Sequence, residues 1–224
     1  MKKQWCIGQI SAEFIWRMET VLDIYEQDHD PQRPVICFDE RPCQMLGDVV
    51  APIPMEPGRV QRQDHHYRRN GTCVVMMAVE PLAGKRMVSV VGQKTKKDYA
   101  RFMKKVEEVY RHAEKIILVQ DNLNTHNPSS FYETFPPKAA FVLSQRFQMV
   151  YTPKKASWLN MAEIELSALS KQCLDRRIGD INTFSDEVEA WARQRNRRKV
   201  TISWQFTKND ARDKLCRFYQ SVRN

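Results

Sequence analysis

The sequence lacks any apolar run long enough to span a membrane, and none of its cysteines has the spacing of a zinc site. A spanning helix needs roughly 18 or more consecutive apolar residues, and no run in this chain approaches that length. The first ten residues carry two lysines but no sustained apolar stretch, so we expect no signal peptide. The six cysteines are scattered without a CxxC pair, which favours reduced, buried thiols in a cytosolic protein.

Internal repeats and low-complexity segments are also absent. The length of 224 residues allows a single domain with a large core. Positive charge is in excess, because 36 lysines and arginines face 27 acids and give a net charge of +9. A polyanion such as nucleic acid is a reasonable partner for such a chain, although many basic proteins share this balance.

Apolar periodicity predicts alternating strands and helices. Helices are expected over 11–27, 95–112, 158–177, 183–198 and 207–219, with short ones between 127 and 146. Strands are expected over 35–38, 71–79, 85–91, 116–120 and 147–151, with a long irregular segment over 41–70. The core order β-β-β-α-β-α-β-α predicts an α/β mixed sheet with helices on both faces. We divide the chain into an N-terminal helix and linker (1–34), a core (35–180) and a basic helical extension of the same domain (181–224).

Two of the expected strands run directly into an acid. Val35–Phe38 leads into Asp39, and the strand from Ile116 leads into Asp121. Open sheets bind ligands beyond the carboxyl ends of their strands, and if these two strands are parallel neighbours, the two acids lie side by side. A third acid, Glu163 or Glu165, follows on the helix after the last strand. Taken singly, each acid is better explained as a cap or a surface residue.

A cluster of carboxylates predicts a particular chemistry. Its members raise one another's pKa unless cations neutralise them, and hard oxygen ligands select Mg²⁺ or Mn²⁺. Two such ions, roughly 3.5–4 Å apart, can activate an attacking oxygen and stabilise a leaving one. In a basic chain this suggests phosphodiester chemistry on nucleic acid. The helix periodicity leaves Glu163 and Glu165 equally placed, one on each side of the apolar stripe.

Other polar groups have less certain roles. Asp64, His65 and His66 could suggest a metal, but adjacent histidines are expected to point in different directions, which favours a solvated or DNA-facing loop. Trp158 could stack on a base or lie in the core. The basic side chains proposed to contact phosphates, which give affinity rather than sequence information, lie within 61–69 and 193–199 and beside Trp158; they include Lys154, Lys155, Arg195, Arg197 and Arg198.

Three blocks resemble the signature motifs of a known family. FDE (38–40), QDNLNTH (120–126) and SWLNMAEIE (157–165) are similar to those of DDE transposases in the mariner-like superfamily, specifically its bacterial insertion-sequence six-thirty family. The resemblance implies a ribonuclease H-like fold. It also favours Glu163 over Glu165, and it implies that Asp39, Asp121 and Glu163 are catalytic and bind Mg²⁺ or Mn²⁺, as two ions. The same blocks imply site-ordering roles for Asn122, His126 and Asn160.

The resemblance also implies an activity and partners. These are metal-dependent cleavage and transfer of double-stranded DNA, from the element's inverted ends to a TA target, by a homodimer in the bacterial cytoplasm, at the nucleoid. Two features depart from the pattern: Met161 and Ala162 replace the common proline and bulky apolar residue, and the interval between Asp121 and Glu163 is longer than usual.

Family members carry N-terminal helix-turn-helix domains, whereas this chain begins almost at the catalytic fold. We therefore expect an isolated catalytic domain, from a truncated copy or from the second frame of a split element. One alternative is a DNA-binding remnant that is catalytically idle or depends on a partner. Another is a cellular ribonuclease H-like nuclease without strand transfer.

Overall fold

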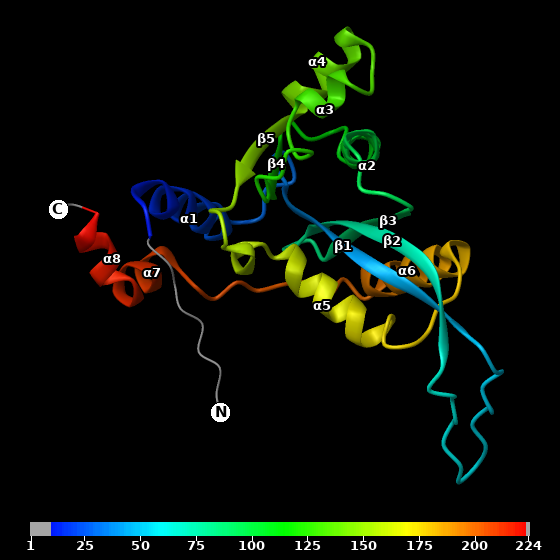
Figure 1. Cartoon of the computed structure of the whole chain (residues 1–224). Helices are drawn as coiled ribbons and strands as arrows, with labels where there is room; N and C mark the ends of the chain where they lie inside the picture. The colour runs from blue at the N-terminus through cyan, green and yellow to red at the C-terminus, as the bar shows by residue number, and fades with distance from the viewer. Residues whose placement is uncertain (1–9, 223–224) are drawn as a thin grey trace.

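The computed structural model describes residues 10–222 and contains one five-stranded sheet (Figure 1). The first nine residues of the predicted segment 1–34, including Cys6, and the last two of 181–224 lie outside the described residues. The strand order is β3-β2-β1-β4-β5, with bounds β1 Val35–Asp48, β2 Tyr67–Glu80, β3 Lys85–Val91, β4 Ile116–Gln120 and β5 Phe147–Tyr151. Strands β1 to β3 pair antiparallel, whereas β1, β4 and β5 pair parallel, so the predicted mixed sheet is confirmed.

Helices cover both faces of the sheet (Figure 1). One face packs against α1 (Ala12–Tyr25), α5 (Ala162–Gln172) and α6 (Ile181–Arg197). The other packs against α2 (Lys96–Val109), α3 (Ser129–Tyr132) and α4 (Pro137–Arg146). Beside α1 lie the last two helices, α7 (Lys208–Lys214) and α8 (Cys216–Ser221). Between residues 10 and 222, no helix has the length and apolar character that a membrane crossing requires.

Strand alternation places successive residues in different cores. Cys37 of β1 packs with α1, whereas Ile36 and Phe38 pack with α2 on the opposite face. Strand β4 is buried along its whole length, which explains its nearly continuous apolar sequence. Side-chain caps at Ser11, Thr95 and Thr207 begin α1, α2 and α7. The single final helix predicted over 207–219 is wrong, because the chain breaks at Leu215 between α7 and α8.

The prediction that the first strand ends at Asp39 is also wrong. Strand β1 continues to Asp48, because its second half pairs antiparallel with β2 after the pairing with β4 has ended. Asp39 therefore lies inside a strand, opposite Met77. The irregular segment shrinks to residues 49–66, which extend from the sheet as a long arm (Figure 1).

The helix predicted to begin at Trp158 begins later. A short 3-10 turn, η1 (Ser157–Leu159), is followed by Asn160 in extended conformation, and α5 starts at Ala162. The side-chain oxygen of Asn160 accepts a hydrogen bond from the Ala162 amide at 3.1 Å. This local bond satisfies a donor at the helix start, as asparagine does at helix N-termini. The interruption brings the Asn160 side chain to the sheet.

Candidate functional site

Asp39 and Asp121 lie at matching positions on neighbouring parallel strands. The last registered pair between β1 and β4 is Cys37 with Val119, and each acid comes two residues later. The prediction that these strands are parallel neighbours is confirmed. The backbone around the two acids differs, because Asp39 lies within strand β1, whereas Asp121 follows the end of β4.

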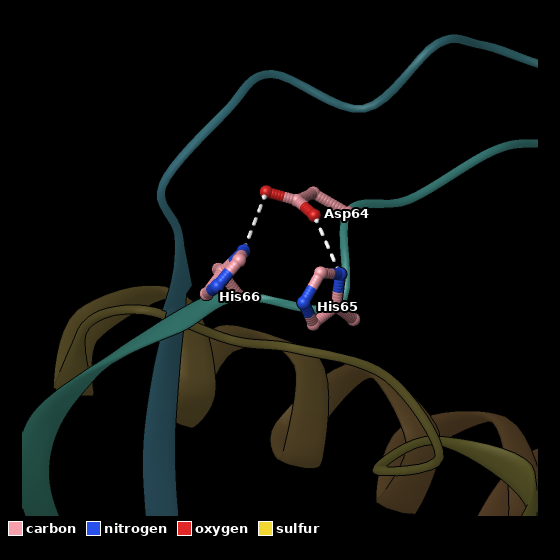
Figure 2. A group of neighbouring side chains, drawn as sticks. All are labelled: Asp64, His65 and His66. Atoms are coloured by element: carbon pink, nitrogen blue, oxygen red, sulfur yellow. Dashed lines mark ion pairs between the residues drawn. The ribbon is translucent and has the colours of Figure 1, made fainter.

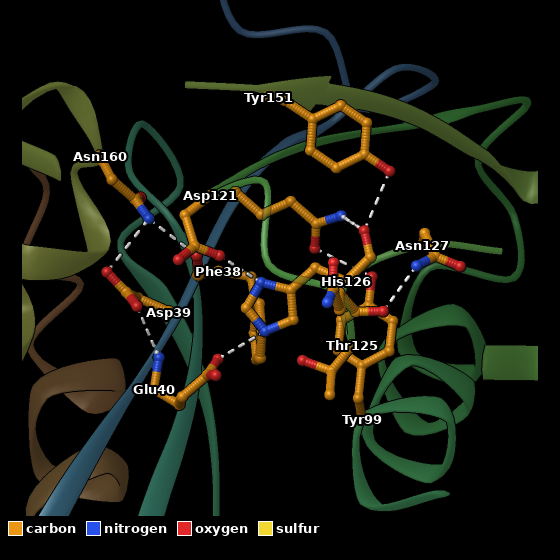
Figure 3. Close-up of polar contacts among 12 residues, drawn as sticks. Phe38, Asp39, Glu40, Tyr99, Asp121, Thr125, His126, Asn127, Tyr151 and Asn160 are labelled. Atoms are coloured by element: carbon orange, nitrogen blue, oxygen red, sulfur yellow. Dashed lines mark hydrogen bonds and ion pairs between the residues drawn. The ribbon is translucent and has the colours of Figure 1, made fainter. Parts of the chain in front are cut away.

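Asn160 connects the start of α5 to this edge of the sheet. Its buried amide donates to the carbonyl oxygen of Phe38 at 2.8 Å and to Oδ2 of Asp39 at 3.3 Å (Figure 3). The segment before α5 and strand β1 are thus fixed against each other. The predicted site-ordering role of Asn160 has a direct geometric basis in these bonds.

Glu163 lies in the first turn of α5, three residues after Asn160, and its side chain is exposed to solvent. Burial, followed by the charges of Glu163 and Asp121, raises the pKa of Asp39 to about 7. Asp39 therefore lies close enough to both other acids, and to Glu40, to be affected by their charges. A divalent cation bound among them would remove the repulsion.

Glu165 is directed elsewhere. Its buried carboxylate accepts a hydrogen bond from Arg86 of β3 at 2.6 Å and two from Arg195 of α6 at 2.8 and 2.9 Å. Burial alone would raise the pKa of Glu165, but the two guanidinium groups lower it below its ordinary value. Glu165 therefore joins α5 to β3 and α6, and Glu163 is the acid left to the candidate site.

His126 bridges two acids (Figure 3). Its Nδ1 contacts Oδ1 of Asp121, and its Nε2 lies 2.8 Å from Oε2 of Glu40. Burial would lower the pKa of His126, but the two carboxylates raise it to about 9. Both imidazole nitrogens are thus directed at carboxylate oxygens and away from solvent. For Asp121, burial is outweighed by the His126 hydrogen bond, so its pKa is lowered.

The loop carrying His126 is held by its backbone as well. Gln120 and Tyr151 both donate to the carbonyl oxygen of His126 at 2.9 Å. Asn122, by contrast, is exposed and forms no side-chain hydrogen bond with the described part of the chain. Its site-ordering role stays a prediction.

Three of the predicted DNA contacts lie on the surface after β5. Lys154 and Lys155 are exposed in the loop after β5, whose first residue, Thr152, donates to Gln120 at the end of β4. Trp158 is 48% exposed and packs edge-on against Phe206, so it is not a core tryptophan.

The basic end of α6 is divided between two roles. Arg197 and Arg198 are exposed. Arg195 is not free to contact DNA, because its guanidinium binds Glu165 and lies over the Trp191 ring. The prediction for Arg195 is therefore corrected to a structural role.

Asp64, His65 and His66 form a separate cluster at the root of the arm (Figure 2). The expectation that the histidines point apart is wrong: their ring centroids are 3.9 Å apart, and the Nδ1 atoms of both approach the Asp64 carboxylate. Arg177 fixes this backbone by donating to the carbonyl oxygens of all three residues. These ion pairs and hydrogen bonds account for the cluster.

Sequence reasoning missed three residues near the acids. Glu40 belongs to the FDE block but had no predicted role. Lys94, which lies 2.5 Å from Glu40, had none either. Arg86 was hidden within a predicted strand. The available signal was alternation, since adjacent acids in a strand point to opposite faces and need different partners.

Comparison with known proteins identifies the family of the chain. A family model described as DDE superfamily endonuclease matches residues 34–185. No protein of curated function matches the sequence significantly.

Solved structures similar to the chain include the Mos1 strand transfer complex, with a TM-score of 0.59 at 10% identity, and the Mos1 mariner paired end complexes with Mn and with Mg, each with a TM-score of 0.56 at 11% identity. Each match covers 100% of this chain and 64% or 65% of the Mos1 chain. This likeness confirms the predicted ribonuclease H-like fold.

Proposed function

The chain belongs to the DDE superfamily endonuclease family, and from that premise we propose that it is the catalytic part of a transposase. The proposed activity is metal-dependent cleavage of double-stranded DNA and transfer of the cut strand to a target. We assign the chain to the bacterial insertion-sequence six-thirty branch on the three sequence blocks. We expect the active form to be a homodimer acting on the inverted ends of an element in the bacterial cytoplasm.

The observation that carries the proposal is that Asp39 and Asp121 occupy matching positions on neighbouring parallel strands, with the start of α5 held against Asp39. Register places the first two acids side by side on β1 and after β4, and Asn160 binds Asp39 three residues before Glu163. An all-carboxylate donor set fits Mg²⁺ or Mn²⁺. Two such ions would be held by these three residues, and when bound they would supply activation of the attacking oxygen and stabilisation of the leaving one.

The remaining residues of the site act on the ligands and on the DNA. Asn160 holds the Asp39 carboxylate, and His126 holds one oxygen of Asp121. Lys154 and Lys155, in the loop beside the end of β4, would contact backbone phosphates. Such contacts do not read sequence, so we expect weak, poorly specific binding by this chain alone, falling steeply with salt.

Asp121→Asn tests the proposal. We expect this variant to keep its fold but to lose Mn²⁺-dependent cleavage of a labelled duplex. Asp213→Asn, which changes an exposed aspartate of α7, is the matched control and should cleave normally. Unchanged cleavage by Asp121→Asn would refute the assignment.

A second assay separates a transposase from a simple nuclease. Pre-cut element ends are incubated with plasmid DNA, and joined products are measured. Cleavage without joining would indicate a nuclease that lacks strand transfer. Saturable DNA binding without any Mn²⁺ uptake would indicate the catalytically idle remnant.

A further inference from the structure

Glu40 is a buried acid beside the site that the proposed chemistry does not use. It follows Asp39 directly on β1, so strand alternation turns its side chain to the opposite face of the sheet. That face is covered by α2 and by the loop carrying His126 (Figure 3). The Glu40 side chain is only 2% exposed, so its charge requires compensation from within the protein.

Two basic side chains lie close enough to provide that compensation. Nε2 of His126 lies 2.8 Å from Oε2, and Nζ of Lys94 lies 2.5 Å from Oε1. Both are contacts by distance, because within residues 10–222 neither carboxylate oxygen receives a well-directed hydrogen bond, from these two groups or from any other. Glu40 is therefore dedicated to these two ion pairs. Lys94, with a side chain 39% exposed in the loop between β3 and α2, remains in contact with solvent.

The imidazole of His126 also contacts Asp121. Its second nitrogen binds Oδ1 of Asp121, and no other side chain of the described residues is hydrogen-bonded to that carboxylate. The ring cannot easily turn, because it stacks on Tyr99 with centroids 5.0 Å apart and meets the edge of Phe38 at 5.2 Å. Lys94, Glu40, His126 and Asp121 thus form a continuous series of side-chain contacts that ends on one oxygen of Asp121.

Asp121 has particular need of such support. It lies beyond the end of β4, where no strand pairing fixes its backbone, whereas Asp39 is paired within β1. Outer-shell partners of metal ligands orient the ligand, and their loss commonly costs roughly 10- to 100-fold in metal affinity.

We propose that Glu40 is a positioning residue for Asp121 and acts through His126. Lys94 supports this role by balancing the charge of Glu40. This inference rests on the proposed function, in which Asp121 binds a divalent ion. It assigns Glu40 a role distinct from that of its neighbour Asp39, because Glu40 never touches the metal. The contacts among Lys94, Glu40, His126 and Asp121 leave Oδ2 of Asp121 for the ion.

Mn²⁺ binding measured by titration calorimetry tests the proposal without relying on cleavage. Glu40→Gln should bind Mn²⁺ roughly 10- to 100-fold more weakly than the wild type. The matched control is Glu80→Gln, which changes a buried glutamate of β2 that pairs with His29 at 2.9 Å and accepts from Tyr110 at 2.9 Å, apart from the three acids. Glu80→Gln should bind Mn²⁺ like the wild type.

A double-mutant cycle distinguishes positioning from a general loss of structure. In a His126→Asn background, Glu40→Gln should weaken Mn²⁺ binding little further, because the connection to Asp121 is already broken. Fully additive losses would overturn the proposal. Should Glu40→Gln fail to fold, Lys94→Ala decides, since it changes an exposed loop residue. Weaker Mn²⁺ binding by Lys94→Ala supports the proposed role of Glu40 and Lys94, and unchanged Mn²⁺ binding overturns it.

The two proposals fail in different ways. Wild-type Mn²⁺ binding that disappears in Asp121→Asn but is unchanged in a folded Glu40→Gln variant would overturn the role of Glu40 alone. A wild-type chain with no Asp121-dependent Mn²⁺ binding would overturn this inference together with the proposed metal site.

Discussion

The side-chain amide of Asn160 lies 3.3 Å from the Asp39 carboxylate and is buried against the sheet. Through this contact, the residue that delays the start of α5 also orients an acid from a strand more than a hundred positions earlier in the chain. The same amide donates to the Phe38 carbonyl, and its oxygen accepts from Ala162. Asn160 therefore fixes the relative placement of Asp39 and Glu163.

Asn160→Ala should reduce both stability and cleavage. Losing a buried amide leaves the Phe38 carbonyl and the Ala162 amide without partners, which costs about 1–3 kcal/mol of unfolding free energy for each buried group. Chemical denaturation and Mn²⁺-dependent cleavage measure the two effects. Asn182→Ala, at an exposed position in the first turn of α6, is the control and should alter neither. Wild-type cleavage by a folded Asn160→Ala variant would show that the amide does not orient the site.

Glu163→Gln and Glu165→Gln should have opposite consequences. Glu163 is exposed, so its substitution should abolish cleavage with little change in unfolding free energy. Glu165 neutralises two arginines, so its substitution should lower the unfolding free energy by about 3 kcal/mol, as breaking a buried ion pair typically does. Thermal unfolding and cleavage assays on both variants check this pair of outcomes. The reverse pattern would assign the third metal ligand to Glu165.

Stability at acid pH should depend on Glu165. Its pKa is lower in the folded chain than the ordinary value of 4.5, so its contribution is present above that value and is lost as the pH falls through the lowered folded pKa. We expect the wild type to lose stability on acidification below about pH 4.5 more steeply than Glu165→Gln, because unfolded glutamates titrate near 4.3. Urea denaturation at a series of pH values measures the slopes; parallel profiles would contradict the prediction.

Much of the fold was predictable because its signals are local. A continuous apolar run marked β4, turn residues marked the β2–β3 hairpin, and Ser11 and Thr95 marked helix starts. The length of β1 was not predictable, because the polar residues after Asp39 are strand-forming only through their pairing with β2. Tertiary pairing overrides local preference in such cases.

The acids of the candidate site were marked in the sequence, whereas the contacts that support them were not. The resemblance selected Glu163, and the structure explains the choice, since Glu165 meets two arginines from distant elements. Arg86 and Arg195 carry no local signal of that partnership. The same holds for Glu40 and Lys94, which meet only after β1, α2 and the His126 loop have assembled.

DNA binding should weaken in steps when the basic loop after β5 is neutralised. Each lost phosphate contact lowers the slope of log affinity against log salt by about 0.9 on duplex DNA. Lys154→Ala combined with Lys155→Ala should therefore reduce the slope by about 1.8. Fluorescence anisotropy with a labelled duplex at several salt concentrations measures the slope.

Arg195→Ala tests, in the same assay, whether overall charge or direct phosphate contact determines the salt slope. It also removes a positive charge, but its partner is Glu165. It should leave the salt slope unchanged and instead lower the melting temperature. An equal slope change in Arg195→Ala would show that overall charge, rather than contact, governs binding.

Strand β1 continues through Asp39, so the backbones of the three acids are supported in three different ways. Asp39 lies in the interior of a paired strand, Glu163 in the first turn of a helix, and Asp121 beyond a strand end, where the contact with His126 supports its side chain. When a smaller ion is exchanged for a larger one, we expect the backbone of Asp39 to move least, because it alone is fixed by strand pairing.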